Sequence, residues 1–258
     1  LYIMKKIIAL LLILACLAPV FAGGQKETNS YVFAANCAWP PLEFVDEKGD
    51  IVGFEIDLIK EFAAMTGYSM SVRNVAWDGI FAGLSNGAYD AIASGVSVTE
   101  ERKPSMEFTT PILYVTQAII VHKQASGMAD LQGLNGKKVG VQLGTTGHIA
   151  LEDAVKAQSN LNIDIKAYDE VGFAVEDLMN GNLDAVVCDS LIASDYVLSN
   201  QNYAGKLTVS GIASEITEPI AIAVKKGNLE FTSLLNDCIA KLEENGKMAE
   251  LKAKWNLL

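Results

Sequence analysis

Small and polar residues follow two apolar runs that begin with almost the same sequence. The chain reads LSNGAYDAIAS at positions 84–94 and LMNGNLDAVVC at positions 178–188. The letters SGVS end the first copy at 94–97, and CDS ends the second at 188–190. Because ligands bind at the carboxyl ends of strands in open α/β sheets, we expect both copies to deliver ligand contacts to one shared cleft.

Other kinds of chemistry lack their usual residues. His122 and His148 are the only histidines, too few for a histidine-rich metal site, and no C-x-x-C pair occurs. The stretch GTTG at 144–147 lacks both the lysine of a phosphate-binding loop and the spacing of a dinucleotide fingerprint. We therefore expect no catalytic residues, no metal and no cofactor.

Composition narrows the class of protein further. Of the 258 residues, 50% are hydrophobic and 20% charged, a balance that allows one large domain or two small ones. The formal net charge is −11, which argues against nucleic acid and anionic membrane surfaces as partners.

The elements that must position these residues alternate between strand and helix. Each repeat copy reads as the end of a helix, a glycine turn and a buried strand. Asp78 is the expected N-cap of the helix before the first copy, and Thr99 is expected to cap a helical turn through Arg102. Strands are expected at 31–35, 70–75, 91–93, 138–141, 163–167 and 185–187, and helices at 56–66, 78–84, 150–157, 173–179, 192–198, 229–245 and 248–255.

This alternation predicts two α/β lobes, each a mostly parallel sheet flanked by helices. Two segments rich in β-formers, 116–122 and 220–224, stand where the chain could cross to the second lobe and return. We expect lobe 1 to comprise 31–113 and 219–258, and lobe 2 to comprise 117–216. A double crossover makes a hinge, and hinged lobes enclose a cleft; the alternative is that both segments are ordinary sheet edges.

In its combination of motifs the chain resembles the type-3 periplasmic solute-binding proteins. That resemblance covers nearly all of the chain after residue 22 and implies a two-lobed type II periplasmic binding protein fold with two crossover hinge strands. The motifs, in the family's order, are WPPLEF (39–44), GFEIDL (53–58), WDGIFAGL (77–84), DAIASGVSVTEER (90–102), FTTP (108–111), LNGKKVGVQLGTT (134–146) and LDAVVCD (183–189).

The resemblance implies a site for a free amino acid. Arg102 takes the place of the arginine that grips the ligand's α-carboxylate, which a guanidinium can do with two parallel hydrogen bonds. Thr145 and Thr146 lead into a helix whose N–H groups would bind the same carboxylate. Asp189 takes the place of the carboxylate that receives the α-ammonium.

Further family positions surround the rest of the ligand. Ser94, Gly95 and Ser97 match the loop that offers hydroxyls and carbonyls to both charged groups. Trp39 and Trp77 match the aromatic pair that sandwiches the ligand's side chain.

Each assignment has a simpler structural alternative. Arg102 could form a surface ion pair with Glu100 or Glu101. Asp189 could only cap the following helix, and the two tryptophans could be core residues.

Several positions depart from the family pattern where specificity is decided. Asn36 replaces an aspartate of relatives that bind basic side chains or glutamine, which favours a neutral polar ligand. Gln142, which is also expected to bind the ligand, stands at a position that varies with specificity. Gly147 replaces a larger polar residue of some relatives, His148 is adjacent to it, and Glu43 could supply an acid at the distal end. Two tryptophans favour a flat cation through cation–π contact, so we expect arginine or a similar polar amino acid.

Two functions from different classes follow. The first is an exported binding protein that captures a polar amino acid by lobe closure, acts as a monomer, and delivers its ligand to an ABC permease with its ATPase. The second is an exported dehydratase for prephenate-like acids on the same fold. For that enzyme, His148 and Glu43 are the candidates for a general acid or base. Prephenate has two carboxylates and no ammonium, so Asp189 favours the binding protein.

The first residues predict export. Basic residues and an apolar run precede Ala22, so residues 1–22 read as a signal peptide, with a competing lipidation motif ending at Cys16. Export places the protein in the periplasm. Cys37, Cys188 and Cys238 remain after cleavage, an odd number that favours small buried side chains over disulfides.

Overall fold

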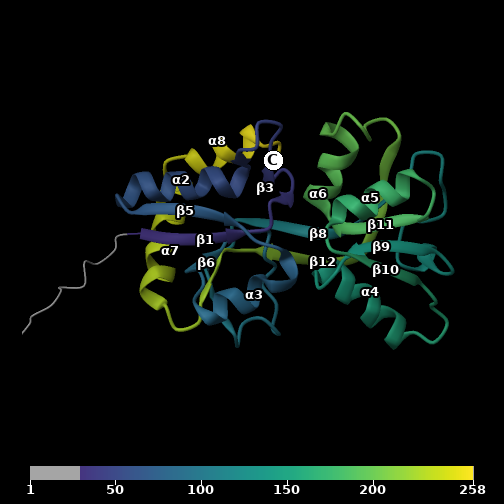
Figure 1. Cartoon of the computed structure of the whole chain (residues 1–258). Helices are drawn as coiled ribbons and strands as arrows, with labels where there is room; N and C mark the ends of the chain where they lie inside the picture. Colours follow the sequence, from purple (N-terminus) through teal and green to yellow (C-terminus); the bar gives the residue numbers. More distant parts are fainter. Residues whose placement is uncertain (1–29, 258) are drawn as a thin grey trace, which may run out of the picture.

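The structure, a computed structural model, describes residues 30–257, which form two lobes side by side (Figure 1). The predicted signal peptide, 1–22, and Cys16 lie outside the described residues. None of the helices in the described range is long and apolar enough to cross a membrane. The two-lobed α/β fold predicted from the sequence is confirmed.

One lobe is built around a five-stranded sheet in the order β5-β1-β6-β13-β7. Helices α2, α7 and α8 share an apolar cluster on one face of this sheet, and α3 packs against the other face. The strands are β1 (Ser30–Ala35), β5 (Ser69–Asn74), β6 (Ala91–Ile92), β7 (Met106–Phe108) and β13 (Ala223–Lys225), and the helices α2 (Phe54–Thr66), α3 (Trp77–Asn86), α7 (Leu229–Glu244) and α8 (Lys247–Lys254).

A small antiparallel sheet beside this lobe carries the segment with two prolines. Its strands are β2 (Ala38–Trp39), β3 (Glu43–Val45) and β4 (Ile51–Val52).

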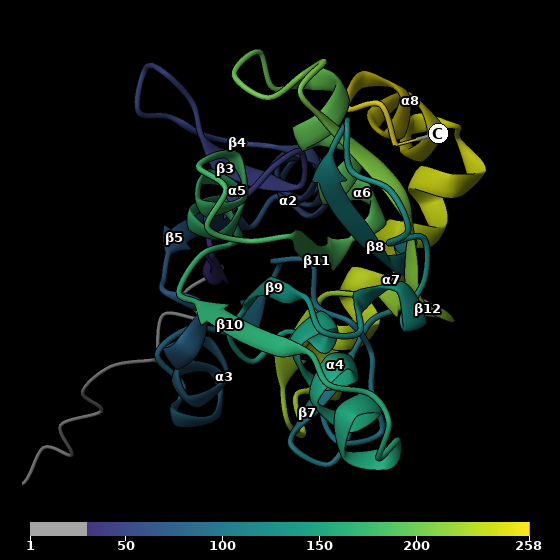
Figure 2. The ribbon, with the colours of Figure 1, turned by 90° about the vertical axis from the view of Figure 1, so that its right-hand side faces the viewer.

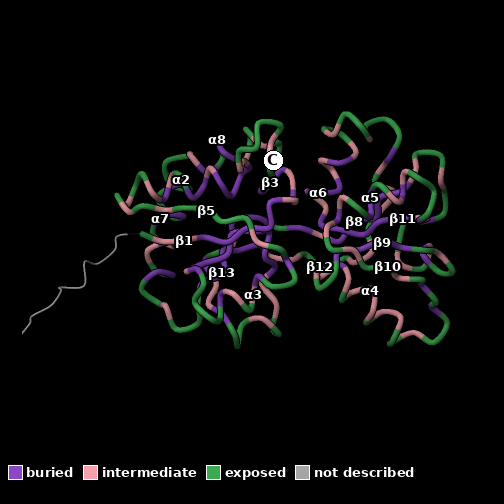
Figure 3. Tube along the Cα trace, viewed as in Figure 1, coloured by how far each residue is buried: buried purple, intermediate pink, exposed green. Residues whose placement is uncertain are grey.

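The other lobe has a five-stranded sheet in the order β10-β9-β11-β8-β12. Figure 2 shows α4 and α5 on opposite sides of this sheet. The strands are β8 (Leu113–His122), β9 (Lys138–Gln142), β10 (Asp164–Tyr168), β11 (Ala185–Asp189) and β12 (Leu207–Ile220), and the helices η2 (Gln132–Leu134), α4 (Thr146–Ala157), α5 (Val171–Met179), α6 (Ser190–Ser194) and the π-helical turn η3 (Asp195–Ser199). Figure 3 shows the sheets buried and the outer helical turns exposed.

The repeated sequence does the same structural work in both lobes. Gly87 and Gly181 follow α3 and α5 in the left-handed conformation, with φ of 75° and 76°, which only glycine adopts without strain. The aspartate of each copy then ties the new strand to its parallel neighbour. Asp90 accepts a hydrogen bond from the Val32 N–H, and Asp184 accepts one from the Lys138 N–H, each at 2.8 Å.

Both sheets are mixed, whereas the sequence predicted mostly parallel ones. β1 runs parallel to β5 and β6, but β13 runs antiparallel to β6 and β7. In the other sheet β9 runs parallel to β10 and β11, while β8 runs antiparallel to β11 and β12. The antiparallel strands are those next to the passages between lobes, where the chain turns back without a crossover helix.

The chain passes between sheets after β7 and again before β13, and the long antiparallel pair β8 and β12 runs between the lobes (Figure 1). β12 was not predicted: it ends at Ile220, where the sequence pattern placed the start of the second crossing segment. Three shifts of register interrupt its pairing with β8. Such irregularities erase the alternation of apolar and polar residues by which a strand is recognised.

Two local expectations need correction, and a third is confirmed. Ala76 is the N-cap of α3, and Asp78 lies within its first turn, where a negative charge still suits the helix dipole. The turn expected from Thr99 to Arg102 is confirmed, since the Thr99 hydroxyl accepts from the Arg102 N–H at 3.2 Å and the Thr99 carbonyl accepts from the Lys103 N–H at 3.1 Å. The helix expected at 192–198 begins at Ser190 and widens into a π-helical turn from Asp195.

Candidate functional site

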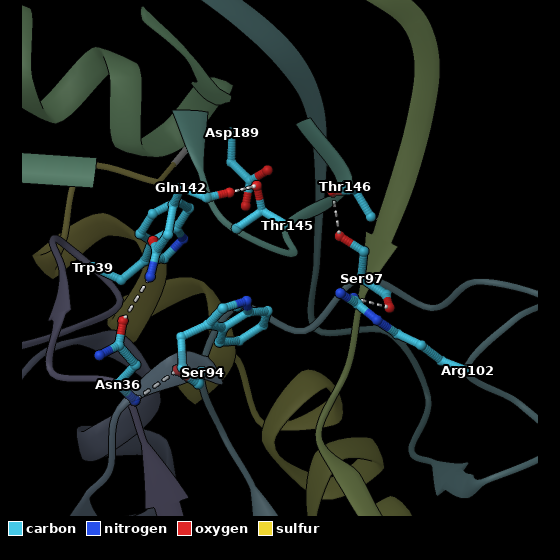
Figure 4. A pocket seen from close by; sticks show the side chains of 11 residues that line it. Asn36, Trp39, Ser94, Ser97, Arg102, Gln142, Thr145, Thr146 and Asp189 are labelled. Atoms are coloured by element: carbon cyan, nitrogen blue, oxygen red, sulfur yellow. Dashed lines mark hydrogen bonds between the residues drawn. The ribbon is translucent and has the colours of Figure 1, made fainter. Parts of the chain in front are cut away.

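A cavity lies between the two lobes (Figure 4). All ten residues that the sequence assigned to ligand binding line it, and Asn36 is the eleventh lining residue. Seven of the eleven come from the lobe of β1, and the rest from that of β9. The lining residues are Asn36, Trp39, Trp77, Ser94, Gly95, Ser97, Arg102, Gln142, Thr145, Thr146 and Asp189.

Asp189 is the buried acid of this cavity. It ends β11, is 5% exposed, and accepts a hydrogen bond from Gln117 Nε2 at 2.8 Å. Although it stands at the N-cap position of α6, its side chain makes no capping hydrogen bond. Burial raises its pKa to about 7, the Glu218 charge acts in the same direction, and the Gln117 hydrogen bond opposes both. A cationic group of a ligand would stabilise the ionised form of this buried carboxylate.

Arg102 supplies the opposite charge on the other side of the cavity (Figure 4). Its guanidinium donates to the Ser97 carbonyl at 3.0 Å and to the Gly144 carbonyl at 3.5 Å, and it lies over the Phe81 ring at 4.8 Å. Among residues 30–257 no carboxylate lies within ion-pair distance of it, so the surface ion pair considered from the sequence is absent. Burial lowers its pKa, while the Glu218 and Asp189 charges raise it.

The start of α4 forms the wall on the side of the β9 lobe. Gly144 takes φ of 72° before the helix, and Thr145 caps it by accepting from the His148 N–H at 3.3 Å. The Thr145 hydroxyl donates to the Gln142 carbonyl at 2.8 Å. Free N–H groups and the dipole of a helix start favour an anion beside them.

The Ser94–Gly95 loop contributes less polar capacity than the sequence suggested. The Ser94 hydroxyl accepts from the Asn36 N–H at 2.8 Å and donates to Glu43 Oε1 at 2.9 Å, so its proton is directed away from the cavity. The Gly95 N–H donates to Glu55 Oε2 at 2.7 Å. A side chain at Gly95, where φ is 57°, would come within 3.0 Å of the Trp39 indole. The loop therefore offers its carbonyls and its shape.

The four candidate specificity residues are not equally placed. Asn36 lines the cavity, and its Oδ1 accepts from Gln142 Nε2 at 3.1 Å. Glu43, Gly147 and His148 are not among the lining residues. A side chain at Gly147 would meet Gln117 Oε1 at 2.5 Å, and the His148 ring accepts from the Gly144 N–H at 3.2 Å.

A second cavity adjoins the first and shares Asn36 and Trp77 with it. Three carboxylates stand in its wall. The lining residues are Asn36, Ala76, Trp77, Asp78, Leu143, Asp169, Glu170 and Phe173.

Comparisons with known proteins agree with this architecture. Residues 31–257 match the family of bacterial extracellular solute-binding proteins, family 3. The chain belongs to this family. It is 34% identical to a probable histidine-binding protein of Neisseria gonorrhoeae, across 98% of this chain and 96% of that protein.

Other relatives of this solute-binding protein carry names of the same kind. It is 28% identical to an arginine-binding extracellular protein of Bacillus subtilis, across 98% of each chain. The solved structure of an ancestral arginine-binding protein bound to arginine superimposes with a TM-score of 0.81 at 33% identity, covering 88% of this chain and 98% of that one.

Two residues beside the cavity of this solute-binding protein escaped sequence reasoning. Gln117 on β8 and Glu218 on β12 come from the two long strands between the lobes. Gln117 is fully buried, and its Nε2 lies 2.8 Å from Asp189 Oδ1 and 3.0 Å from Glu218 Oε1. Only the register that sets Gln117 opposite Asp189 brings them together, and no local motif encodes that register.

The raised pKa of Asp189 predicts how stability depends on pH. Unfolding returns this pKa from about 7 to its ordinary 3.8, so the folded chain binds more protons between these values. The unfolding free energy of the protein without ligand should therefore fall as the pH rises from about 4 to about 7, by up to about 1.4 kcal/mol per pH unit from this one group. Urea unfolding at several pH values should show a shallower fall in Asp189→Asn. An identical slope in both proteins would contradict the shift.

Proposed function

We propose that this protein captures a polar amino acid between its lobes and delivers it to an ABC importer. One observation carries the proposal: the wall of a cavity that both lobes line contains an arginine and a buried aspartate. A free amino acid carries one negative and one positive group, which match these two charges. The names of the relatives, histidine-binding and arginine-binding, support the same class of ligand.

The proposed pose follows from the wall. The ligand's α-carboxylate accepts hydrogen bonds from Arg102 and from the start of α4 at Thr145 and Thr146. Its α-ammonium donates to Asp189. The side chain lies against the Trp39 and Trp77 indoles and points toward Asn36 and Gln142.

Beyond Asn36 the neighbouring cavity favours a cationic side chain. Asp78, Asp169 and Glu170 line this second cavity. These acids could take the place of the aspartate that some relatives carry at the position of Asn36. Arginine or a similar basic amino acid is the ligand that the two cavities support best, with Trp77 as a face for cation–π contact.

Lobe closure is the proposed capture step, with lobe 1 comprising 31–113 and 219–258 and lobe 2 comprising 117–216. Three hydrogen bonds join the two sides directly. Gln142 Nε2 donates to Asn36, Arg102 donates to the Gly144 carbonyl, and the Ser97 and Thr146 hydroxyls lie 3.4 Å apart. Such contacts exist only when the lobes are closed, so a ligand held between the lobes favours that state.

The Gln142 contact gives a test of closure. Gln142→Ala removes the hydrogen bond to Asn36, which should weaken ligand binding by about 1 kcal/mol, or roughly fivefold. Titration calorimetry measures the change. Gln132→Ala is the matched control, because Gln132 donates to Gln158 within one lobe at an exposed site. Equal affinity of Gln142→Ala and wild type would remove this contact from the closure mechanism.

The dehydratase alternative finds less support. Such an enzyme needs a general acid or base over its substrate. His148 and Glu43, the two candidates, are not in the cavity wall. We therefore infer a binding protein and not an enzyme.

The proposed partners follow from the family. A monomer released by cleavage after residue 22 into the periplasm would carry its ligand to a membrane permease, whose ATPase drives import. The buried, unpaired thiols of Cys37, Cys188 and Cys238 require no disulfide formation on export.

The test is calorimetry on the chain from residue 23 onward, unfolded and refolded to remove bound ligand, and titrated with each common amino acid. Saturable binding that is strongest for a basic amino acid supports the proposal. No binding of any amino acid, together with turnover of prephenate, would replace it with the dehydratase.

A further inference from the structure

Two glutamates are buried together beneath the wall of the cavity. Glu43 on β3 and Glu55 on α2 are both fully buried, and their side chains are in hydrogen-bonding contact with each other. An ionised carboxylate in such a place needs partners for both oxygens.

Each glutamate uses one oxygen to hold a neighbouring residue of the cavity wall. Glu43 Oε1 accepts from the Ser94 hydroxyl at 2.9 Å, and Glu55 Oε2 accepts from the Gly95 N–H at 2.7 Å. Ser94 in turn accepts from the Asn36 N–H at 2.8 Å. The two glutamates do not line the cavity themselves, but they hold three residues that do.

The remaining two oxygens require a donor. Glu43 Oε2 and Glu55 Oε1 are buried and have no hydrogen-bond donor among the described residues. One proton between these two oxygens makes a hydrogen bond between the two carboxyl groups. A second proton would leave one carboxyl with an O–H that points at the loop, where the Ser94 hydroxyl and the Gly95 N–H are already donors.

We propose that Glu43 and Glu55 share a single proton and act together as positioning residues that hold the Ser94–Gly95 loop in the shape the ligand needs. The loop's role in amino-acid binding rests on the proposed function; the shared proton does not.

Within residues 30–257 the surroundings of the pair add no other charge that could satisfy it. Cys37, next to β2, is the further titratable group acting on Glu43, and burial raises the pKa of its thiol to about 11, so it is neutral. The loop after β6 contributes only the Ser94 hydroxyl and the Gly95 amide. Burial raises the pKa of Glu43 well above its ordinary value, and the charge of Glu55 raises it further, which places the proton on Glu43.

Glutamine substitutions test how many protons Glu43 and Glu55 hold between them. In Glu43→Gln or Glu55→Gln the amide N–H replaces the shared proton, so each variant should bind L-arginine within about threefold of wild type. In the double variant two amide groups face each other as donors, and Glu43→Ala loses the contact to Ser94. Both should bind L-arginine at least about tenfold more weakly. Glu61→Gln, a half-buried position on the same helix α2, should match wild type.

Infrared difference spectra at pH 8 test the proton without any ligand. The band of a protonated carboxyl should be present in wild type and missing from both single variants, because the remaining carboxylate then accepts from an amide. Urea unfolding gives the same order as binding, with the double variant least stable. If neither the wild type nor any variant binds an amino acid, the proposed function fails. The infrared and unfolding measurements would still test whether Glu43 and Glu55 share a proton.

Two results would overturn the proposal. One is a double variant as stable and as tightly binding as the singles. The other is a protonated carboxyl band that persists in either single variant.

Discussion

Asp189→Asn should weaken binding of the amino-acid ligand by at least about 3 kcal/mol, or more than 100-fold. The side chain keeps its size but loses the charge that faces the ligand's ammonium. Between two lobes that close on the ligand, an unpaired ammonium loses most of the solvent that could replace that charge. The wild-type affinity should also fall as the pH drops below about 7, because Asp189 takes up a proton there, and the variant should lack this fall.

Calorimetry from pH 5 to pH 8 measures both effects. Asp153→Asn is the control, since Asp153 is an exposed acid on α4 in the same lobe. Near wild-type affinity in Asp189→Asn would reassign the ammonium to another acid, and Glu218 is the nearest alternative on the same Gln117 amide.

Arg102→Met should cost at least as much, again about 3 kcal/mol or more of binding free energy. The ligand's carboxylate loses its cation, and the Ser97 and Gly144 carbonyls lose their donor. Arg102→Lys should recover part of the affinity, because the charge returns without the paired N–H geometry of a guanidinium.

The chain has one other arginine, Arg73, which is exposed and donates to the Ala88 carbonyl. Arg73→Met therefore controls for the change of charge. Thermal unfolding of each variant separates lost binding from lost folding. If Arg102→Met bound normally, the α-carboxylate would have to be held by the start of α4 alone.

Much of the cavity was predictable because its residues follow local signals. Asp189 and Ser94 come directly after apolar runs that could only be strands, and Thr145 precedes a helix on a glycine turn. The repeated sequence around Gly87 and Gly181 predicted two similar lobes, because each copy has the residues that one helix-to-strand turn needs.

Contacts across the fold were not predictable. Gln117 and Glu218 look like ordinary strand residues, and the register of β8 decides that Gln117 reaches Asp189. The strand β12 escaped notice because its irregular pairing hides the alternating pattern. Glu43 was a candidate for touching the ligand, yet the structure places it behind Ser94.

The sequence alone therefore determined the order of helices and strands and the local turns that deliver Ser94, Arg102, Thr145 and Asp189. Hydrophobic periodicity and the freedom of glycine act within a few residues, so they can be read along the chain. The tertiary structure decided which of these groups face one cavity and how Gln117 orients Asp189. It also brought Glu43 and Glu55 into one buried contact, because burial and cross-strand hydrogen bonds join residues that are far apart in the chain.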